Sequence, residues 1–366
     1  MINLQKLFAD VFDPHPGETA LVLIDIPHGN ITDTADWAER RTMAQRWHAA
    51  LRDFGQQRGF HVLPLACYPA TGAHNAQLPD KGLLGDTPTP LAQLAAQATL
   101  ILAMTQFSAS APLMEWTKRR PVLRAASMPL VAPAMEATAL AADYAEIARA
   151  CAALHQRLSN AQAARITFSN GDRLLLDIRF RTPHVDDGQL RPDKTPPRLV
   201  NLPSGETYVA CYEGEQTTIP SQTQGVLPVP WRNEIVRLEI AQNRVVEVLG
   251  LSDAAADLRN FLALDGARRN VAELGLGCNP HARVRGNILE DEKAGPHIAL
   301  GRSDHIGGVI GPTAFEDPAH IWHQDFVYAR ESPIYVTDLT LIDAENRADQ
   351  LVYQGEYLLH AMMAAK

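Results

Sequence analysis

Five side chains in the second half of the sequence are of the types that bind metal ions. They lie in the segments NLPSGE, VAELGLGCNP, GPHIALG and WHQDF, and they are Glu206, Glu273, His297, His323 and Asp325. Turns at strand ends are where a rigid scaffold presents functional side chains, and the glycines in these segments allow close backbone approach. In the His-x-Asp pair, residues two apart on a strand point to the same face, so both side chains can reach a common site.

These ligand types restrict the ion. Imidazole combined with carboxylate suits Zn, Co, Mn or Fe(II), whereas an all-oxygen set suits Mg or Ca. Three carboxylates and two imidazoles exceed what one tetrahedral ion uses, but two divalent ions that share a bridging carboxylate employ all five. For any one of these residues alone, a structural or surface role is the simpler interpretation. The agreement of order, spacing and flanking glycines favours a common metal site.

The motifs NLPSGE, AELGLGCNP, EDEKAGPHIALG and HQDF, in this order, resemble those of the aminopeptidase T family of metallopeptidases. The resemblance is strongest from about residue 165 to 328 and extends loosely into the first half. It implies two divalent metal ions, Zn, Co or Mn, held by the matching residues. It also implies a homodimer. The residues that match the family's ligands are Glu206, Glu273, His297, His323 and Asp325.

The chain departs from the family at one position. The family has a functional tyrosine seven residues beyond the histidine of its H-I-A motif, and this chain has Asp304 there. A phenol can donate a hydrogen bond to a developing oxyanion, and an ionised carboxylate cannot. Asp304 can instead bind a metal, orient His305 or hold a substrate amine. Either Glu273 or Glu206 can serve as general base or only as a bridging ligand, and the sequence does not separate these roles.

A second resemblance supplies an alternative. The 2,5-dihydroxypyridine dioxygenase family also has a PSG turn and an H-x-D pair, and it holds one Fe(II) by two histidines and a carboxylate. In that family a histidine replaces the glutamate at the position of Glu273, so the retained Glu273 favours the two-metal hydrolase. A triad of His297, His323 and Asp325 keeps the single-iron alternative open. A non-catalytic metal-binding protein is the third possibility.

The first half of the chain alternates strand and helix. TALVLIDIP (residues 19 to 27) is a short apolar run typical of a buried parallel strand, and residues 36 to 57 have apolar side chains near helical spacing. Further runs predict a second and a third strand, and the Ala-rich run from Met135 to Leu158 predicts a closing helix. We therefore expect an α/β domain with an open parallel sheet over residues 1 to 160. No GxGxxG follows the first strand, so nothing indicates a dinucleotide site.

The second half changes to strand periodicity. ARITFSNGDRLLLDIRF has two strands around an Asn170-Gly171 turn, which is the pattern of a β-hairpin. Residues 182 to 200 are rich in proline and charge and predict a long loop or flap. Strand-like segments then dominate, with one helix at about 253 to 263. We expect a β-rich α+β domain over residues 161 to 366, which carries the metal site and the catalytic residues.

Several other acidic residues have simpler interpretations. The acids of EDEK (residues 290 to 293) are expected at a loop surface, although Glu290 or Glu292 can reach the site from there. Glu213 and Glu215 flank Gly214 and are expected in a turn after a strand. The segment DIPHGN, which begins at Asp25, lies at the carboxyl end of a predicted strand, where α/β sheets bind ligands. A helix-capping loop explains it equally well, so it receives no role.

Composition sets the remaining limits. The chain has 366 residues, too many for one ordinary core, with 46% hydrophobic and 20% charged residues. A net charge of -9 without a large basic cluster argues against a nucleic-acid partner and favours a small-molecule or short-peptide substrate. The N-terminal segment lacks a signal-peptide pattern, and no apolar run is long enough for a membrane span. Four separated cysteines without a CxxC pair fit a cytoplasmic protein.

Overall fold

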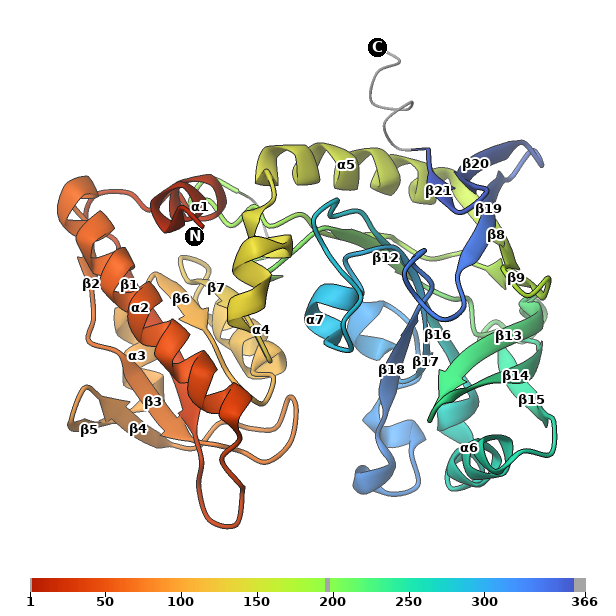
Figure 1. Ribbon diagram of the computed structural model, residues 1–366, viewed down its shortest axis with the longest axis horizontal. Helices are drawn as coiled ribbons and strands as arrows, with labels where there is room; N and C mark the ends of the chain where they lie inside the picture. The colour runs from red at the N-terminus through yellow and green to blue at the C-terminus, as the bar shows by residue number, and fades with distance from the viewer. Residues whose placement is uncertain (1, 195–197, 359–366) are drawn as a thin grey trace. The chain divides into compact units, whose positions relative to one another are not determined.

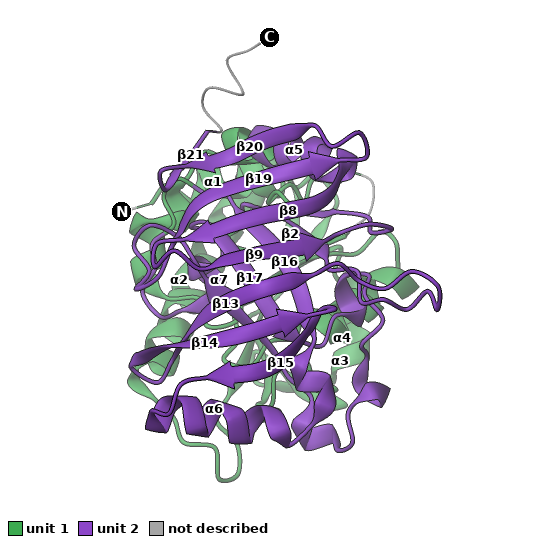
Figure 2. Cartoon of the chain, turned by 90° about the vertical axis from the view of Figure 1, so that its right-hand side faces the viewer, with its two compact units in different colours: residues 1–148, 186–204, 280–282 green, residues 149–185, 205–279, 283–366 purple. Residues whose placement is uncertain are grey.

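The computed structural model describes residues 2–194 and 198–358 of the chain (Figure 1). The chain forms two compact units, each assembled from segments that are distant in the sequence (Figure 2). Unit 1 comprises residues 1–148, 186–204 and 280–282, and unit 2 comprises residues 149–185, 205–279 and 283–366. The sequence predicts two domains that meet at residue 160. That these two segments fold independently stays a prediction.

Unit 1 is built on a mixed sheet whose centre is parallel. The strands run in the order β11-β7-β6-β1-β3-β4-β5, and β2 also pairs with β1. All pairings from β11 to β3 are parallel, whereas β4 and β5 add an antiparallel edge. The bounds are β1 (Thr19–Ile26), β2 (His61–Val62), β3 (Ala66–Pro69), β4 (Lys81–Leu84), β5 (Thr87–Pro90), β6 (Leu100–Ala103), β7 (Arg124–Ser127) and β11 (Leu199–Asn201). The expected α/β sheet is therefore present, but only partly parallel.

The helices of unit 1 are α1 (Leu4–Val11), α2 (Ala35–Arg58), α3 (Leu91–Gln97) and α4 (Ser110–Arg119). The longest, α2, is the helix expected from residue 36 to 57. It begins where the Thr34 hydroxyl accepts a hydrogen bond from the Trp37 backbone N–H. It ends at Gly59, whose φ of 80° is the left-handed conformation that closes many helices.

The single helix expected from Met135 to Leu158 is wrong in its first part. Two 3-10 turns, η1 (Pro133–Ala137) and η2 (Ala139–Ala141), precede the helix α5 (Tyr144–Asn160). The Asp143 carboxylate accepts hydrogen bonds from the backbone N–H groups of Ala145 and Glu146, so it starts α5 afresh. This local side-chain cap outweighs the helix propensity of the alanines before it.

Unit 2 contains a large antiparallel sheet in the order β15-β14-β13-β9-β8-β19-β20-β21, which lies in one layer in Figure 2. The expected hairpin forms its centre, with Gly171 at a φ of 86° in the turn. The bounds are β8 (Ala161–Phe168), β9 (Arg173–Asp177), β13 (Gln224–Trp231), β14 (Glu234–Ala241), β15 (Arg244–Leu249), β19 (Val336–Asp343), β20 (Ala348–Tyr353) and β21 (Glu356–Tyr357). A helix, α6 (Asp253–Ala263), follows β15.

A second sheet of five strands has the order β10-β12-β16-β17-β18. Its pairings from β12 to β18 are antiparallel. The bounds are β10 (His184–Asp186), β12 (Glu206–Ala210), β16 (Val271–Gly277), β17 (Pro296–Gly301) and β18 (His323–Val327). One buried apolar cluster joins this sheet to the large sheet, so the two sheets share a core.

The segment from 182 to 200, expected as a long loop, contains β10 and the start of β11. Its residues 195–197 lie outside the described part. Across residues 2–194 and 198–358, no helix combines the length and the apolar character that a bilayer crossing requires.

Candidate metal centre

The two faces of the five-stranded sheet differ in chemistry. On one face Leu274, Ile298 and Leu300 are at most 1% exposed and belong to the shared apolar core. Because successive side chains of a strand point to opposite faces, the residues between them lie on the other face. That second face carries all five residues that the sequence analysis selected.

The strand register lines these residues up. Glu206 on β12 is opposite Gly277 on β16. Glu273 on β16 is opposite Ala299 on β17, which in turn is opposite Asp325 on β18. Paired residues share a face of the sheet, so the carboxylates project to the same side.

Small residues between the ligand candidates leave room for the imidazoles. Gly275 is opposite His297, and Gly301 is opposite His323. A Cβ added to Gly275 would lie 1.8 Å from His297 Nε2, because the imidazole ring lies over this glycine. The glycines that the sequence analysis noted beside Glu273 therefore make space for a side chain of the neighbouring strand.

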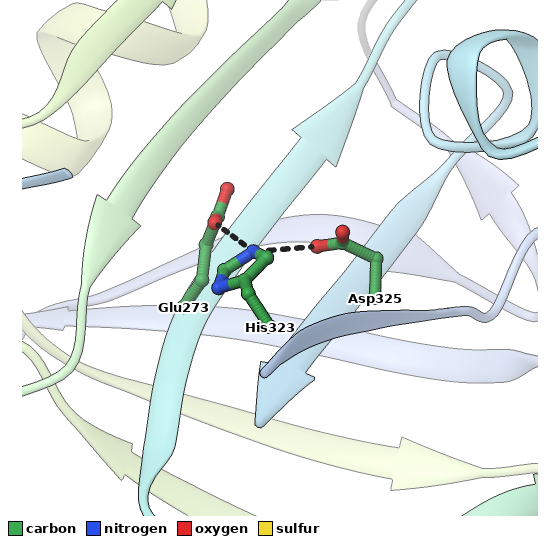
Figure 3. A group of neighbouring side chains, drawn as sticks. All are labelled: Glu273, His323 and Asp325. Carbon is green, nitrogen blue, oxygen red and sulfur yellow. Dashed lines mark ion pairs between the residues drawn. The ribbon is translucent and has the colours of Figure 1, made fainter. Parts of the chain in front are cut away.

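Glu273 is the centre of the group. Its Oε1 lies 3.7 Å from His297 Nε2, and its Oε2 lies 3.5 Å from His323 Nε2. His323 Nε2 is also 3.6 Å from Asp325 Oδ1 (Figure 3). On the other side, His297 Nε2 is 3.4 Å from Glu206 Oε2. One carboxylate thus faces two imidazoles, each of which faces a further carboxylate.

Only part of this set is closely spaced enough for one ion. Ligand atoms of Glu273, His323 and Asp325 all lie within 4.8 Å of one another. Among the described residues, this is the group of three metal-ligand side chains that meets that spacing. His297 adjoins this group through Glu273, and Glu206 adjoins His297, but neither belongs to the group.

The hydrogen bonds of the two histidines leave the correct nitrogens available. His323 Nδ1 is 2.6 Å from the carbonyl oxygen of Arg302, and His297 Nδ1 is 3.4 Å from that of Gly295. A carbonyl oxygen only accepts, so each Nδ1 carries a hydrogen, and in the neutral ring each Nε2 keeps its lone pair toward Glu273. Such outer hydrogen bonds are typical of histidines that ligate metal.

Charge interactions in the group shift the pKa values of its members. Burial lowers the pKa of His297, but the carboxylates of Glu273, Glu206 and Asp325 outweigh it and raise the pKa to about 10. Burial also lowers the pKa of His323, but Asp325 and Glu273 outweigh it and raise the pKa well above its usual value. Burial raises the pKa of Glu273, but hydrogen bonds from both histidines lower it below the usual range. In the absence of a metal, the histidines are therefore protonated at neutral pH.

The residues fit a divalent cation. Glu206 is 6% exposed, and its buried Oε2 accepts no hydrogen bond from any described residue. The protonated His297 ring lies 3.4 Å from this oxygen without a hydrogen bond to it. A buried carboxylate oxygen that accepts no hydrogen bond is costly, and a metal ion at this point would satisfy it. Carboxylate oxygens and Nε2 atoms form a mixed oxygen and nitrogen donor set, which suits Zn, Co, Mn or Fe(II).

The segment EDEK lies differently from the sequence expectation. The surface loop expected there is wrong, because α7 (Ile288–Asp291) forms, Glu290 is 2% exposed and Lys293 is fully buried. Lys293 Nζ is 2.6 Å from Glu206 Oε1 and 2.6 Å from Glu292 Oε1. Sequence reasoning missed Lys293, since a lysine in a charged run is ordinarily exposed. Its place immediately before the motif of His297 was the available signal.

Asp304 lies outside the group. Its side chain is 35% exposed, and Arg302 Nη2 donates to its Oδ2 at 3.2 Å. It follows β17 on a 3-10 turn, η4 (Asp304–Ile306). His305 Nδ1 is 3.8 Å from Asp304 Oδ1, and the His305 ring meets the His323 ring edge-on with centroids 4.8 Å apart. Of the roles considered for Asp304, direct metal ligation receives no support from this position.

Glu213 has a structural role that the sequence did not reveal. Its side chain is 4% exposed and accepts hydrogen bonds from Asn270 Nδ2, Ser303 Oγ and the Val309 backbone N–H, each at 2.6 Å. These bonds tie the turn that carries Asp304 to Asn270, the residue before β16.

Comparisons with known proteins identify the fold. No family model matches the sequence, and no curated protein matches it. The structure is similar to that of 2,5-dihydroxypyridine dioxygenase from Pseudomonas putida KT2440, with a TM-score of 0.63 and 16% identity over 97% of this chain and 96% of the other. It is also similar to wild-type AmpT, aminopeptidase T, from Thermus thermophilus, with a TM-score of 0.55 and 15% identity over 97% and 98%.

Both structures belong to the families that the sequence motifs resemble, and both are enzymes. At this level of identity the likeness concerns the fold and leaves the reaction open. The resemblance predicted from the motifs is confirmed in the fold: the chain has the mixed α/β architecture that aminopeptidase T shares with 2,5-dihydroxypyridine dioxygenase.

Proposed function

We propose that the chain is a metal-dependent hydrolase of the aminopeptidase T type, which cleaves a peptide or amide bond next to a free amine. The observation that carries the proposal is the position of Glu273. Its two oxygens face two different imidazoles, at 3.7 Å and 3.5 Å, as a carboxylate that bridges two ions does. Glu273 is 6% exposed on β16, and both of its oxygens face histidines that can ligate metal.

In this proposal Glu206 and His297 would hold one ion, His323 and Asp325 would hold the other, and Glu273 would serve both. Bound divalent ions supply Lewis-acid polarisation of a carbonyl and make water more acidic. The chain's own residues then orient the reactants. The hydrogen bonds from His323 to Arg302 and from His297 to Gly295 fix both rings. Glu206 or Glu273 accepts the proton of the attacking water. Asp304, which is paired with Arg302, is the proposed contact for the substrate's amine.

A small-molecule or short-peptide substrate, a homodimeric assembly and a cytoplasmic location are parts of the same proposal. The net charge of -9 supports a substrate that is not a nucleic acid.

A dioxygenase that uses a single Fe(II) and acts on a hydroxylated N-heteroaromatic ring is the second candidate. One observation favours it: among the described residues, Glu273, His323 and Asp325 offer three ligand atoms within 4.8 Å of one another, which is a ligand set for one ion. This group has one histidine and two carboxylates, so it differs by one ligand from the usual facial triad of two histidines and one carboxylate. The triad of His297, His323 and Asp325 considered from the sequence is not the group within this spacing.

Metal analysis of anaerobically purified protein, paired with two assays, separates the candidates. The hydrolase predicts two Zn, Co or Mn ions per chain and release of ammonia from leucine amide. One oxygen-sensitive iron per chain, with oxygen uptake on a hydroxylated pyridine, would replace it by the second candidate. Bound metal without turnover in either assay would indicate a non-catalytic metal-binding protein. If the protein bound no metal even after metal was added back, the hydrolase, the dioxygenase and the metal-binding protein would all be refuted.

A further inference from the structure

Lys293 makes the two halves of the metal centre chemically unequal. Its ammonium group is 0% exposed and lies 2.6 Å from Glu206 Oε1, so the half formed by Glu206 and His297 already contains a cation. Throughout residues 2–194 and 198–358, no lysine or arginine forms an ion pair with Glu273 or Asp325. The carboxylates of the other half are instead paired with imidazoles, and an imidazole gives up its charge when it binds a metal ion, whereas the ammonium group of Lys293 stays.

The path of the backbone places Lys293 beside Glu206. Gly277 is opposite Glu206 in the strand pair, and a Cβ added there would lie 2.2 Å from the carbonyl oxygen of Glu292. The backbone of Glu292 and Lys293 therefore passes over a strand position that only glycine can occupy. The Asn279 backbone N–H donates to the Lys293 carbonyl oxygen at 2.9 Å and fixes this passage.

The ammonium group occupies only one oxygen of Glu206. Oε1 accepts from Lys293, whereas Oε2 faces His297 Nε2 at 3.4 Å and accepts no hydrogen bond from a described residue. An ion at Oε2 would therefore share the Glu206 carboxylate with the ammonium group of Lys293, which is hydrogen-bonded to Oε1. Like charges that share one buried carboxylate repel strongly, so the ammonium group weakens the binding of a second ion at Oε2.

We propose that Lys293 sets the order of metal binding: the half of Glu273, His323 and Asp325 binds the first ion tightly, and the half of Glu206 and His297 binds a second ion weakly. This inference rests on the proposed two-metal function. Lys293 acts on the affinity of the second position through charge and does not ligate metal itself. Its buried positive charge also stabilises Glu206 in the metal-free protein, where an unpaired carboxylate would be costly.

A calorimetric titration of the metal-free full-length protein with Zn²⁺, in the presence of a competing chelator, tests the inference. The wild type should bind in two steps that differ at least ~10-fold in Kd, and Lys293→Met should tighten the second step at least ~10-fold while the first changes less than ~3-fold. Lys118→Met is the matched control, because Lys118 is exposed on α4, and both steps should stay unchanged. Asp325→Asn and Glu206→Gln assign the steps: the former should remove the tight step and the latter the weak one.

A second variant keeps the test decisive if Lys293→Met does not fold. Lys293→Met combined with Glu206→Gln and Glu292→Gln removes Lys293 together with the charges of both carboxylates that it contacts, and this variant should fold and bind one ion with the affinity of the wild-type first step. Two equal steps in the wild type, an unchanged or weakened second step in Lys293→Met, or one ion in both proteins would overturn the inference. Wild-type protein that binds no Zn²⁺ would instead refute the proposed function.

Discussion

Asp25 in unit 1 and Glu206 in unit 2 are both acids buried on strands, but their oxygens are used differently. Asp25 is 0% exposed near the end of β1, and it accepts hydrogen bonds from Trp37 Nε1 at 3.0 Å and from the backbone N–H groups of Gln106 and Phe107 at 2.7 Å and 2.9 Å. Glu206 is 6% exposed and leaves Oε2 without a donor. Burial alone therefore does not mark a functional acid.

The difference concerns what each carboxylate is for. Both carboxylate oxygens of Asp25 accept hydrogen bonds from residues of unit 1. Asp25, the first residue of the segment DIPHGN, therefore holds the loop after β6 in place. Burial raises the pKa of Asp25, and these hydrogen bonds and Arg40 counteract the rise. Glu206 belongs to a group whose remaining ligand atoms face one another across 3.4 Å to 3.7 Å. A buried carboxylate that lacks hydrogen bonds and lies among other metal-binding side chains is a candidate metal ligand, whereas one with a full set of hydrogen bonds has a structural role.

The largest effect is expected at Glu273, which both halves of the metal centre share. Glu273→Gln should lower metal affinity by roughly 1,000-fold and abolish turnover, since even hydrogen bonds to metal ligands contribute 10- to 100-fold. The metal content after dialysis against a weak chelator measures this loss. Glu247→Gln on the exposed side of β15 is the control and should retain the wild-type metal content. A Glu273→Gln protein with full metal content would remove Glu273 from the ligand set.

Asp25→Ala should have the opposite signature. It leaves the backbone N–H groups of Gln106 and Phe107 without their acceptor, whereas Trp37 Nε1 keeps the Asp25 carbonyl oxygen. The free energy of unfolding should therefore fall by about 2 kcal/mol or more, with unchanged metal stoichiometry. Chemical denaturation and metal analysis of the same sample measure both quantities. Asp86→Ala in the turn between β4 and β5 is an exposed control and should change stability by less than about 0.5 kcal/mol. Loss of metal in Asp25→Ala without loss of stability would reverse the comparison.

The pH dependence should separate metal-free from metal-loaded protein. The raised pKa values of His297 and His323 contribute stability that is complete below their unfolded value of 6.5 and is lost as the pH rises through about 10 for His297. The lowered pKa of Glu273 contributes stability that is present above its unfolded value of 4.5 and is lost in acid. The metal-free protein should therefore gain most from these pairs between about pH 4.5 and 6.5.

Metal binding requires neutral imidazoles, so ion uptake at pH 7 should release about two protons. Calorimetry in buffers of different ionisation enthalpy counts them, and the apparent affinity should rise with pH. Uptake without proton release would show that His297 and His323 are not displaced from their ion pairs, and hence that they do not ligate the ion.

Gly275→Ala should give a smaller change confined to one half of the centre. Its Cβ would meet His297 Nε2 at 1.8 Å, so the ring must move and the affinity of the Glu206 half should fall about 10-fold. In the control Gly266→Ala, the added Cβ meets only the end of the Arg244 side chain at 3.5 Å. Equal titration curves for wild type and Gly275→Ala would show that the position of the His297 ring is unimportant for binding.

The smallest effect on metal binding is expected for Asp304→Tyr. The pair between Asp304 and Arg302 is partly exposed, so its loss should cost at most about 1 kcal/mol of stability and leave the metal content unchanged. If the position governs substrate choice, hydrolysis of leucine amide should rise. Unchanged kinetics on leucine amide would show that residue 304 takes no part in the reaction.

Local patterns in the sequence predict many elements but not their junctions. The apolar run of β1, the helix α2 and the Asn170-Gly171 hairpin follow from short-range spacing, and all three are present. The Ala-rich helix fails at its start because a single cap at Asp143 decides where α5 begins. The joining of β11 to β7 depends on pairing between residues about 75 positions apart, which no local pattern encodes.

The candidate site divides in the same way. Five candidate ligands near glycine and proline were visible in the sequence, and the strand register places them on one face. The burial of Lys293 and Glu292 was not visible, because it depends on backbone passing over Gly277. Which oxygen of Glu273 meets which histidine, and that Asp304 turns toward Arg302, are likewise properties of side-chain packing.

Anomalous diffraction from crystals of the Zn²⁺-loaded protein tests the central claim most directly. The account predicts two anomalous peaks that flank the Glu273 carboxylate, one bonded to His297 Nε2 and Glu206 Oε2 and the other to His323 Nε2 and Asp325. A metal-loaded crystal with no peak within bonding distance of Glu273, or with these five side chains directed apart, would contradict it.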